Sequence, residues 1–439
     1  MTSFDLVIRN GVIVSGAGRA TGDIAVRNGI IEAIGSFATA DARAFFDARG
    51  LHVLPGIIDT HVHLREPGLT HKEDLETGTR AAALGGVTSV FDMPNTNPET
   101  TTAERIAEKV ALAKGRTFAD HAFYAGATAE NADALGAIEK APGCAGVKIF
   151  MGSSTGSLLI EDDATIARVL AGTRRCVAVH AEDEARLKAR RIFAEYDRPE
   201  THGIWRDPEC ARRAVERLIA LARAARRHVH VLHGTTAGEA ALLKDAKDVA
   251  TMETTPQHLT LTAPECYARL RSYAQMNPPI RSLEHREALW QAIADGVIDT
   301  IGSDHAPHAR AEKEQAYPAS PSGLPGVQTM LPLMLDHVAA GRLSLERLVQ
   351  LCAENPARIF GIAGKGRIAA GFDADFALVD PAASQIIRNE DMASRCGWTP
   401  FDGIPVKGKV AATILRGHVV ARDGAVIGPA IGAPVRFSA

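Results

Sequence analysis

Short apolar runs alternate with helical patterns through the middle of the chain. Buried parallel strands read as continuous apolar runs, and strands that alternate with helices indicate a parallel sheet. The predicted strands are 53–60, 86–92, 119–126, 145–150, 176–180, 228–233, 248–254 and 297–303. The clearest helical patterns between them are 73–84, 103–114, 211–226 and 284–295. Eight such units predict an α/β fold, a (β/α)8 TIM barrel.

Both ends of the chain follow a different pattern. Short β-like runs separated by turn residues fill residues 4–36 and return after residue 376. The pairs Asn10-Gly11 and Asn28-Gly29 are flanked by apolar residues and predict hairpin turns. We therefore expect one small β-sandwich domain built from residues 1–53 and 365–439, with the barrel spanning 54–364.

Composition narrows the class of protein. The chain has 439 residues, 46% of them hydrophobic, and a formal net charge of −3, which predicts a large core and no nucleic-acid or membrane surface. No apolar run approaches the ~18 residues of a membrane span, and the first residues lack a signal-peptide pattern. The six cysteines show no C-x-x-C spacing and are expected to be reduced, as in a cytoplasmic protein.

The first predicted strand ends in the candidate chemistry that is easiest to recognise. His61, His63 and Arg65 alternate with Val62 and Leu64, so an extended chain points all three to one side. Two imidazoles suit a transition metal, and an adjacent guanidinium suits a carboxylate. Taken alone, the two histidines are as compatible with surface positions, or with a core position for His63, as with a metal site.

Other predicted strand ends carry similar groups. Lys148, His180, His233 and Asp304 stand at or just after the ends of strands four, five, six and eight. Active sites of (β/α)8 barrels form at the carboxyl ends of the strands. Ligand-type residues at five strand ends therefore predict a metal site at one rim of the barrel.

Lys148 has two interpretations. A lysine flanked by Val147 and Ile149 inside a barrel is costly to bury as a cation. Either it forms an ordinary salt bridge, or its amine adds carbon dioxide and becomes a carbamate that bridges two metals. The ligand-type residues at the other strand ends favour the carbamate.

Simpler roles exist for the remaining candidates. His180 and Asp304 each have the position of a helix cap, and His233 has that of a core residue. We expect structural roles for His228, His230, His258 and His305. The recurrence at five strand ends favours a metal site over these separate explanations.

Five motifs resemble the dihydroorotase family of the amidohydrolase superfamily, whose members have a binuclear metal centre. The resemblance covers essentially the whole chain, and Lys148 resembles the subtype that uses a carboxylated lysine. The motifs are residues 61–68 (HVHLREPG), 93–98 (MPNTNP), 277–281 (NPPIR), 303–308 (SDHAPH) and 323–329 (GLPGVQT). One departure is the small Gly234 after His233, which implies a minor packing change.

The resemblance implies a metal centre with two Zn²⁺ per chain. His61, His63 and Asp304 would bind the more buried ion, and His180 and His233 the more exposed one. Carboxylated Lys148 and a hydroxide would bridge them. Cobalt or manganese suits the same ligands.

The resemblance also assigns substrate contacts. Arg65, Asn95 and His308 would hold a substrate carboxylate. Asn277 and the backbone near Pro325 and Gly326 would contact the amide edges of the ring. In the loop 151–161, Ser154 or Thr155 would reach over the substrate.

The implied activity is the reversible cyclisation of N-carbamoyl-L-aspartate to L-dihydroorotate in pyrimidine biosynthesis, with Asp304 as general base and acid. The resemblance further implies a homodimer and a possible association with aspartate transcarbamoylase. The alternatives are an allantoinase, a hydantoinase or dihydropyrimidinase, and a non-catalytic subunit of aspartate transcarbamoylase.

Overall fold

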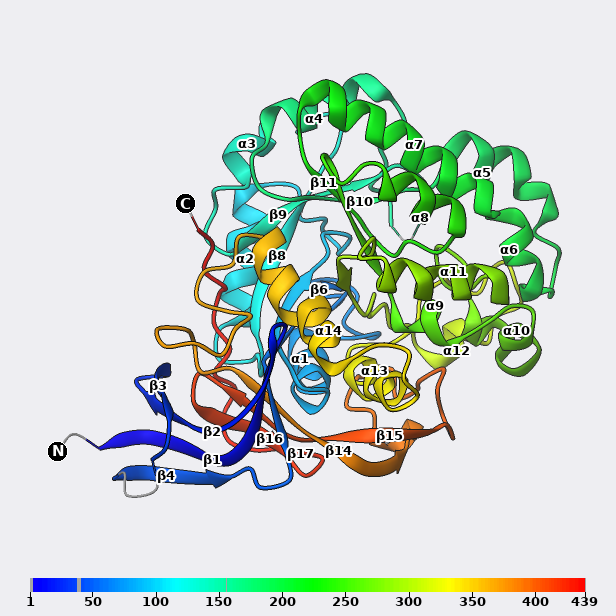
Figure 1. The fold of residues 1–439 in the computed structure, drawn as a ribbon. Coiled ribbons are helices and arrows are strands. Elements are labelled where there is room, and N and C mark those ends of the chain that lie inside the picture. Colours follow the sequence, from blue (N-terminus) through cyan, green and yellow to red (C-terminus); the bar gives the residue numbers. More distant parts are fainter. Residues whose placement is uncertain (1–2, 38–40, 155, 439) are drawn as a thin grey trace.

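The computed structural model describes residues 3–37, 41–154 and 156–438, and its centre is an eight-stranded parallel sheet curved into a barrel (Figure 1). Each strand pairs with the next strand of the barrel along the chain. The strands are β6 (Ile57–Val62), β7 (Val87–Asp92), β8 (Asp120–Gly126), β9 (Cys144–Phe150), β10 (Val177–His180), β11 (Val229–Val231), β12 (Ala250–Thr254) and β13 (Thr300–Ile301). The prediction of a (β/α)8 barrel is confirmed.

A short contact closes the barrel between its first and last strands. Val62 forms an isolated parallel bridge with His305, and the His63 N–H donates to the His305 carbonyl at 2.7 Å. This contact brings the residues that follow β6 next to those that follow β13.

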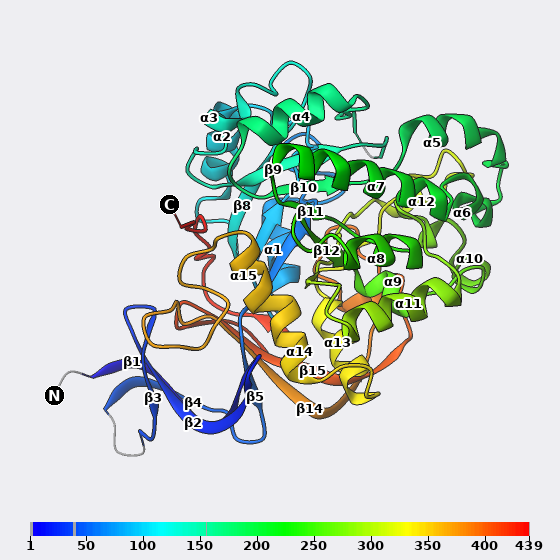
Figure 2. The same ribbon diagram turned by 45° about the horizontal axis from the view of Figure 1, so that its top comes forward.

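Helices cover the outside of the barrel (Figure 2). The helices are α1 (Leu75–Leu84), α2 (Ala103–Ala113), α3 (Leu135–Ile138), α4 (Asp163–Gly172), α5 (Glu184–Arg190), α6 (His202–Trp205), α7 (Pro208–Ala225), α8 (Ala237–Lys244), α9 (Pro256–Thr260), α10 (Glu265–Leu270), α11 (Leu283–Ala294), α12 (Arg310–Lys313), α13 (Met330–Ala339), α14 (Leu345–Val349) and α15 (Asn355–Ile359). Helix α7 begins three residues before the predicted 211–226 because Asp207 caps it and Pro208 occupies its first turn. Among the described residues, no helix combines the length and hydropathy needed to cross a membrane.

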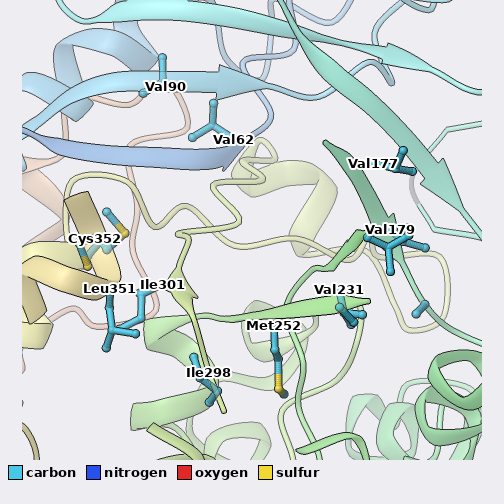
Figure 3. Close-up of a cluster of buried hydrophobic side chains, with 14 of the residues drawn as sticks. Val62, Val90, Val177, Val179, Val231, Met252, Ile298, Ile301, Leu351 and Cys352 are labelled. Carbon is cyan, nitrogen blue, oxygen red and sulfur yellow. The ribbon is translucent and has the colours of Figure 1, made fainter. Parts of the chain in front are cut away.

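The barrel strands divide their side chains between two apolar layers. Val177, Val179 and Val231 belong to the layer between strands and helices, and Figure 3 shows Leu351 beside Ile301 in the same layer. The other layer fills the inside of the barrel and contains Ile58, Phe91, Ala122, Tyr124, Ala178 and Phe360. The alternation of the strands leaves polar side chains to point inward near the carboxyl ends.

Both ends of the chain meet in a second, mostly antiparallel sheet of nine strands with an apolar core of its own, which includes Ile24, Phe376 and Ile414. Its strands are β1 (Phe4–Ser15), β2 (Gly18–Arg27), β3 (Ile30–Gly35), β4 (Ala42–Asp47), β5 (His52–Pro55), β14 (Phe376–Ile386), β15 (Pro405–Leu415), β16 (His418–Arg422) and β17 (Ala425–Val426). The expected β-domain from both termini is confirmed, and its boundaries at residues 53 and 365 stay a prediction.

Two local predictions are wrong. The run 53–60 is two strands, because β5 joins the terminal sheet and β6 joins the barrel. Gly56 separates them at a point where a Cβ would lie 2.2 Å from Thr88 Oγ1. Asn10-Gly11 is a bulge inside β1, whereas Asn28-Gly29 does join β2 to β3.

The connection between β14 and β15 returns to the rim of the barrel. In this segment, residues 387–404, the buried Trp398 indole donates to the His308 carbonyl at 2.8 Å. Ser394 bonds to the buried Glu73, whose Oε2 also lies 3.2 Å from His305 Nε2. The terminal sheet therefore supports the loop after β13.

A buried ion cluster also ties the two sheets together. Lys365 Nζ lies 2.7 Å from Asp120 at the start of β8, 3.0 Å from Asp373 and 2.5 Å from Asp375. The three carboxylates lie close enough together to hold a metal ion, but the Lys365 ammonium contacts all three. We interpret the cluster as structural.

Replacing Lys365 with methionine leaves three buried carboxylates without their shared cation. We expect the free energy of unfolding in urea to fall by about 3–5 kcal/mol. The control is Lys244→Met, which breaks an exposed pair with Asp295 and should change stability by less than about 1 kcal/mol. Equal effects of the two variants would contradict the structural role of the cluster.

Candidate metal and substrate site

All six residues predicted as metal ligands line one pocket at the carboxyl ends of the barrel strands. His61 lies in β6 and His63 just after it, Lys148 lies in β9, and His180 ends β10. The loops after β11 and β13 contribute His233 and Asp304. The lining residues are His61, His63, Arg65, Asn95, Lys148, Phe150, Ser154, His180, His233, Asn277, Asp304, Ala306, Ser322 and Gly323.

His61, His63 and Asp304 form the first ligand group. Asp304 Oδ1 lies 3.2 Å from His61 Nε2 and 3.3 Å from His63 Nε2. Ligand atoms bonded to one tetrahedral Zn²⁺ at 2.0–2.1 Å lie about 3.3 Å apart. The spacing of these three side chains therefore fits one metal ion.

Neighbouring polar groups orient both imidazoles of this group. His61 Nδ1 lies 2.7 Å from Glu253 Oε1, and His63 Nδ1 lies 2.8 Å from Asn95 Oδ1. Because these oxygens accept, each Nδ1 carries the hydrogen and each Nε2 presents a lone pair to the pocket. Gly302 makes room for Glu253, since a Cβ there would lie 2.4 Å from Glu253 Oε2.

His180 and His233 form the second ligand group. His180 Nδ1 lies 2.9 Å from His233 Nε2, and His180 Nε2 lies 3.0 Å from Glu182 Oε2. Glu182 is fully buried and paired with Arg206. The ion-pair contact with Glu182 holds Nε2 of His180 away from His233, so Nδ1 is the His180 nitrogen on the side of His233.

Burial keeps these histidines neutral. Desolvation lowers the pKa of His61 to about 3 and holds the pKa values of His63 and His233 well below their usual range. The pKa of His180 is also lowered by burial, although Glu182 opposes the shift. Neutral imidazole is the form that binds metal.

Lys148 is buried between the two ligand groups. Its Nζ lies 4.6 Å from the centre of the Phe150 ring, and among the described residues no carboxylate forms an ion pair with it. Burial lowers the pKa of Lys148 to about 7, although Asp304 and Glu253 oppose the shift. A substantial neutral fraction of this amine is therefore present near pH 7, which disfavours the ordinary salt bridge.

The backbone at the site is strained. Arg65, His233 and Asp304 have φ values of 63°, 37° and 43°, in the left-handed region that non-glycine residues rarely adopt. These are three of the ten described non-glycine residues with positive φ. Such strain persists only where surrounding contacts fix the chain, and it is typical of functional sites.

Arg65 has spare hydrogen-bonding capacity inside the pocket. Its Nε donates to the Pro307 carbonyl at 3.1 Å, and its buried Nη1 has no acceptor among the described residues. Its Nη2 lies 3.2 Å from His308 Nε2, which in turn lies 3.0 Å from the Ser322 carbonyl.

The partners of His308 decide what Nη2 can do. Lys72 Nζ lies 3.2 Å from His308 Nδ1 and can only donate, so Nδ1 accepts and Nε2 carries the hydrogen, which it donates to Ser322. His308 Nε2 therefore cannot accept from Arg65. Both terminal nitrogens of the buried guanidinium remain available to a ligand, and a carboxylate matches this two-pronged donor.

The other predicted substrate contacts are distributed unevenly. Arg65, Asn95, Asn277 and Ser154 line the pocket. His308 is buried behind Arg65, and Pro325 and Gly326 line a smaller cavity next to His305. In the loop 321–326, Ser322 and Gly323 line the main pocket in place of Pro325 and Gly326. Thr155 lies outside the described residues. The substrate roles of all these residues stay predictions.

Sequence reasoning missed the acidic partners of the ligands. Glu253 stands next to the last residue of β12, and Glu182 follows His180 by two residues. The sequence signal that could have revealed Glu253 is that it is the one acidic residue in the strand Ala250–Thr254, which is buried throughout. His230, His258 and His305 bond to Thr251, Pro278 and Glu73, in agreement with the structural roles expected for them.

The architecture and the pocket define a barrel enzyme whose reactive groups gather at the carboxyl ends of the strands. Residues 52–420 match the model of the amidohydrolase family, and the chain belongs to this family.

Relatives and solved structures agree with this membership. A dihydroorotase from Halobacterium salinarum is 40% identical over 436 residues, which cover 98% of this chain and 99% of the relative. An allantoinase from Rubrobacter xylanophilus is 38% identical, covering 98% and 97%. The structure of an L-hydantoinase (dihydropyrimidinase) from Arthrobacter aurescens superposes with a TM-score of 0.94 at 31% identity, covering 98% and 99%.

Replacing Glu253 with glutamine alters the carboxyl group that orients His61. We expect the affinity for Zn²⁺ to fall about 10- to 100-fold, measured by competition with a chromophoric chelator. The matched control is Glu139→Gln, which alters a buried carboxylate that accepts from two backbone N–H groups away from the pocket. A loss of affinity of the same size in both variants would contradict the assignment.

Proposed function

We propose that this protein is a dihydroorotase, which interconverts N-carbamoyl-L-aspartate and L-dihydroorotate in pyrimidine biosynthesis. The carrying observation is Arg65, a buried guanidinium in the pocket whose Nη1 has no acceptor among the described residues and whose Nη2 meets only His308 Nε2, an atom that also faces the Ser322 carbonyl. Dihydroorotate carries a ring carboxylate that matches this donor pair, whereas dihydropyrimidines and hydantoin rings do not. The 40% identity to a dihydroorotase supports the proposal.

We propose two Zn²⁺ as cofactors. His61, His63 and Asp304 would hold one ion, and His180 and His233 the other. Lys148 would reach both ions as a carbamate, formed when its neutral amine bonds to the carbon of carbon dioxide and releases a proton. A pair of such ions lowers the pKa of water and polarises the carbonyl under attack.

Asp304 has the position needed for proton transfer. Its carboxylate lies at the centre of the first ligand group and is only 5% exposed. In hydrolysis it accepts the proton of the attacking water and delivers it to the departing ring nitrogen. In cyclisation it starts protonated and works in reverse. Asn277 and Ser154, on the far side of the pocket, would contact the ring.

The named alternatives differ from this proposal at identifiable places. An allantoinase or a hydantoinase needs the same metal ligands but no partner for a carboxylate, so Arg65 favours dihydroorotase. A non-catalytic subunit has no need of the ligands, yet all six are present and line the same pocket. We also propose that the protein forms a homodimer, associates with aspartate transcarbamoylase and is located in the cytoplasm.

Replacing Arg65 with methionine tests the choice of substrate. We expect kcat/KM for dihydroorotate hydrolysis to fall about 100-fold or more, because a charged, two-pronged contact in a desolvated pocket is lost. Hydrolysis of dihydrouracil, which has no carboxylate, is the internal control and should not fall. Arg65→Lys keeps the positive charge but loses the paired N–H donors, so its kcat/KM for dihydroorotate should lie between those of the unmodified enzyme and Arg65→Met. An Arg65→Met enzyme with normal dihydroorotate turnover would exclude this function.

Replacing Asp304 with asparagine tests the proton path. In the unmodified enzyme we expect hydrolysis to quicken as pH rises and cyclisation to quicken as pH falls, since the carboxyl must start ionised in one direction and protonated in the other. The variant should lose about 10²- to 10⁴-fold in kcat in both directions. Its metal content is measured in parallel, and near-normal activity in a metal-loaded variant would rule out this role.

A further inference from the structure

A buried histidine lies directly behind Asn277 and takes no part in the proposed chemistry. His202 belongs to α6, in the excursion between β10 and β11, and is 1% exposed. Its Nε2 lies 2.9 Å from Asn277 Oδ1 and 3.1 Å from the Met276 carbonyl oxygen. His202 itself is not among the residues that line the pocket.

The Met276 carbonyl fixes the tautomer of this ring. A backbone carbonyl oxygen can only accept, so His202 Nε2 must carry the hydrogen. The other ring nitrogen, Nδ1, lies 3.3 Å from the Tyr317 hydroxyl and can accept from it. Burial and the nearby Arg206 charge lower the pKa of His202 to about 3, so the ring stays neutral near pH 7.

The fixed tautomer also fixes the amide of Asn277. Because Nε2 donates, the Asn277 atom that faces His202 must be the carbonyl oxygen, and the amide nitrogen Nδ2 must face the other way. There it lies 3.4 Å from Ser154 Oγ, and both residues line the pocket. Asn277 therefore presents a hydrogen-bond donor to whatever occupies this side of the pocket.

We propose that His202 is a positioning residue that holds Asn277 with its N–H₂ group toward the substrate, so that this side of the pocket selects a carbonyl oxygen of the ring. The assignment rests on the proposed function and sharpens it. In dihydroorotate the matching group is the ring carbonyl between the two nitrogens. An N–H group of the ring would meet a donor there and is disfavoured.

A double-mutant cycle tests the positioning role. His202→Leu, Asn277→Ala and the double variant are compared by kcat and KM for dihydroorotate hydrolysis. We expect each single variant to raise KM about 5- to 20-fold, with kcat changed less than about 3-fold, since a ground-state hydrogen bond is lost. The double variant should match Asn277→Ala alone, because His202 acts through Asn277.

Two further variants separate positioning from packing. His202→Gln can still donate toward Asn277 and should recover most of the KM that His202→Leu loses. The matched control is His337→Leu. Like His202, which packs against Trp205 and Tyr317, His337 packs against an aromatic ring and bonds to a hydroxyl group. His337 lies on α13 and does not line the pocket. This control should leave KM unchanged.

Asn277→Asp keeps the test decisive if His202→Leu does not fold. The His202 N–H would hold one carboxylate oxygen and leave the other facing the substrate carbonyl, so KM should rise further than in Asn277→Ala. An Asn277→Asp enzyme with unchanged KM, or additive effects in the cycle, would overturn the proposal.

Failure of the proposed function gives a different result. If the unmodified enzyme hydrolyses hydantoin, allantoin or dihydrouracil in place of dihydroorotate, the proposed function is wrong. The cycle is then run with that substrate, because each of these rings has a carbonyl between two nitrogens. Coupling between His202 and Asn277 would support the positioning role, and its absence would refute it.

Discussion

The contact between His63 and the carbonyl of His305 closes the barrel, and the site depends on it. Closure joins strands that are more than 200 residues apart in sequence, and it places the histidines after β6 against Asp304 after β13. The first ligand group combines side chains from both of these segments. The same contact draws Arg65 under Pro307, so the candidate substrate pocket is assembled by the hydrogen bond that completes the sheet.

Around this closure, the chain buries many polar side chains, and several of them hold another polar side chain in place. Glu253 orients His61, Glu182 orients His180, and His202 orients Asn277. An unpaired polar group at this depth is strongly destabilising, so such networks persist only when each member is satisfied. Arg65 and Lys148 differ from these residues, because Nη1 of Arg65 has no acceptor and Lys148 has no ion pair among the described residues.

The strand order and the metal-ligand candidates were predictable from sequence because both depend on residue type at short spacing. The remaining features depend on contacts between distant segments. Asn10-Gly11 and Asn28-Gly29 carry the same local signal and share positive φ at Asn, yet the pairing strands make one a bulge and the other a turn. Glu253 and His202 escaped detection because their partners are on other elements, and the path of the 321–326 loop exposes Gly323 where Pro325 and Gly326 were expected.

The segment 387–404 has a consequence for how this gene can be recombined. Trp398 and Ser394 come from the sheet of the termini, yet they support the loop that carries His305 and His308. A chimera that exchanged the barrel alone would combine the candidate pocket of one parent with the supporting segment 387–404 of the other. The packing of this loop therefore depends on two separated stretches of coding sequence, the one that encodes the barrel and the one that encodes residues 387–404.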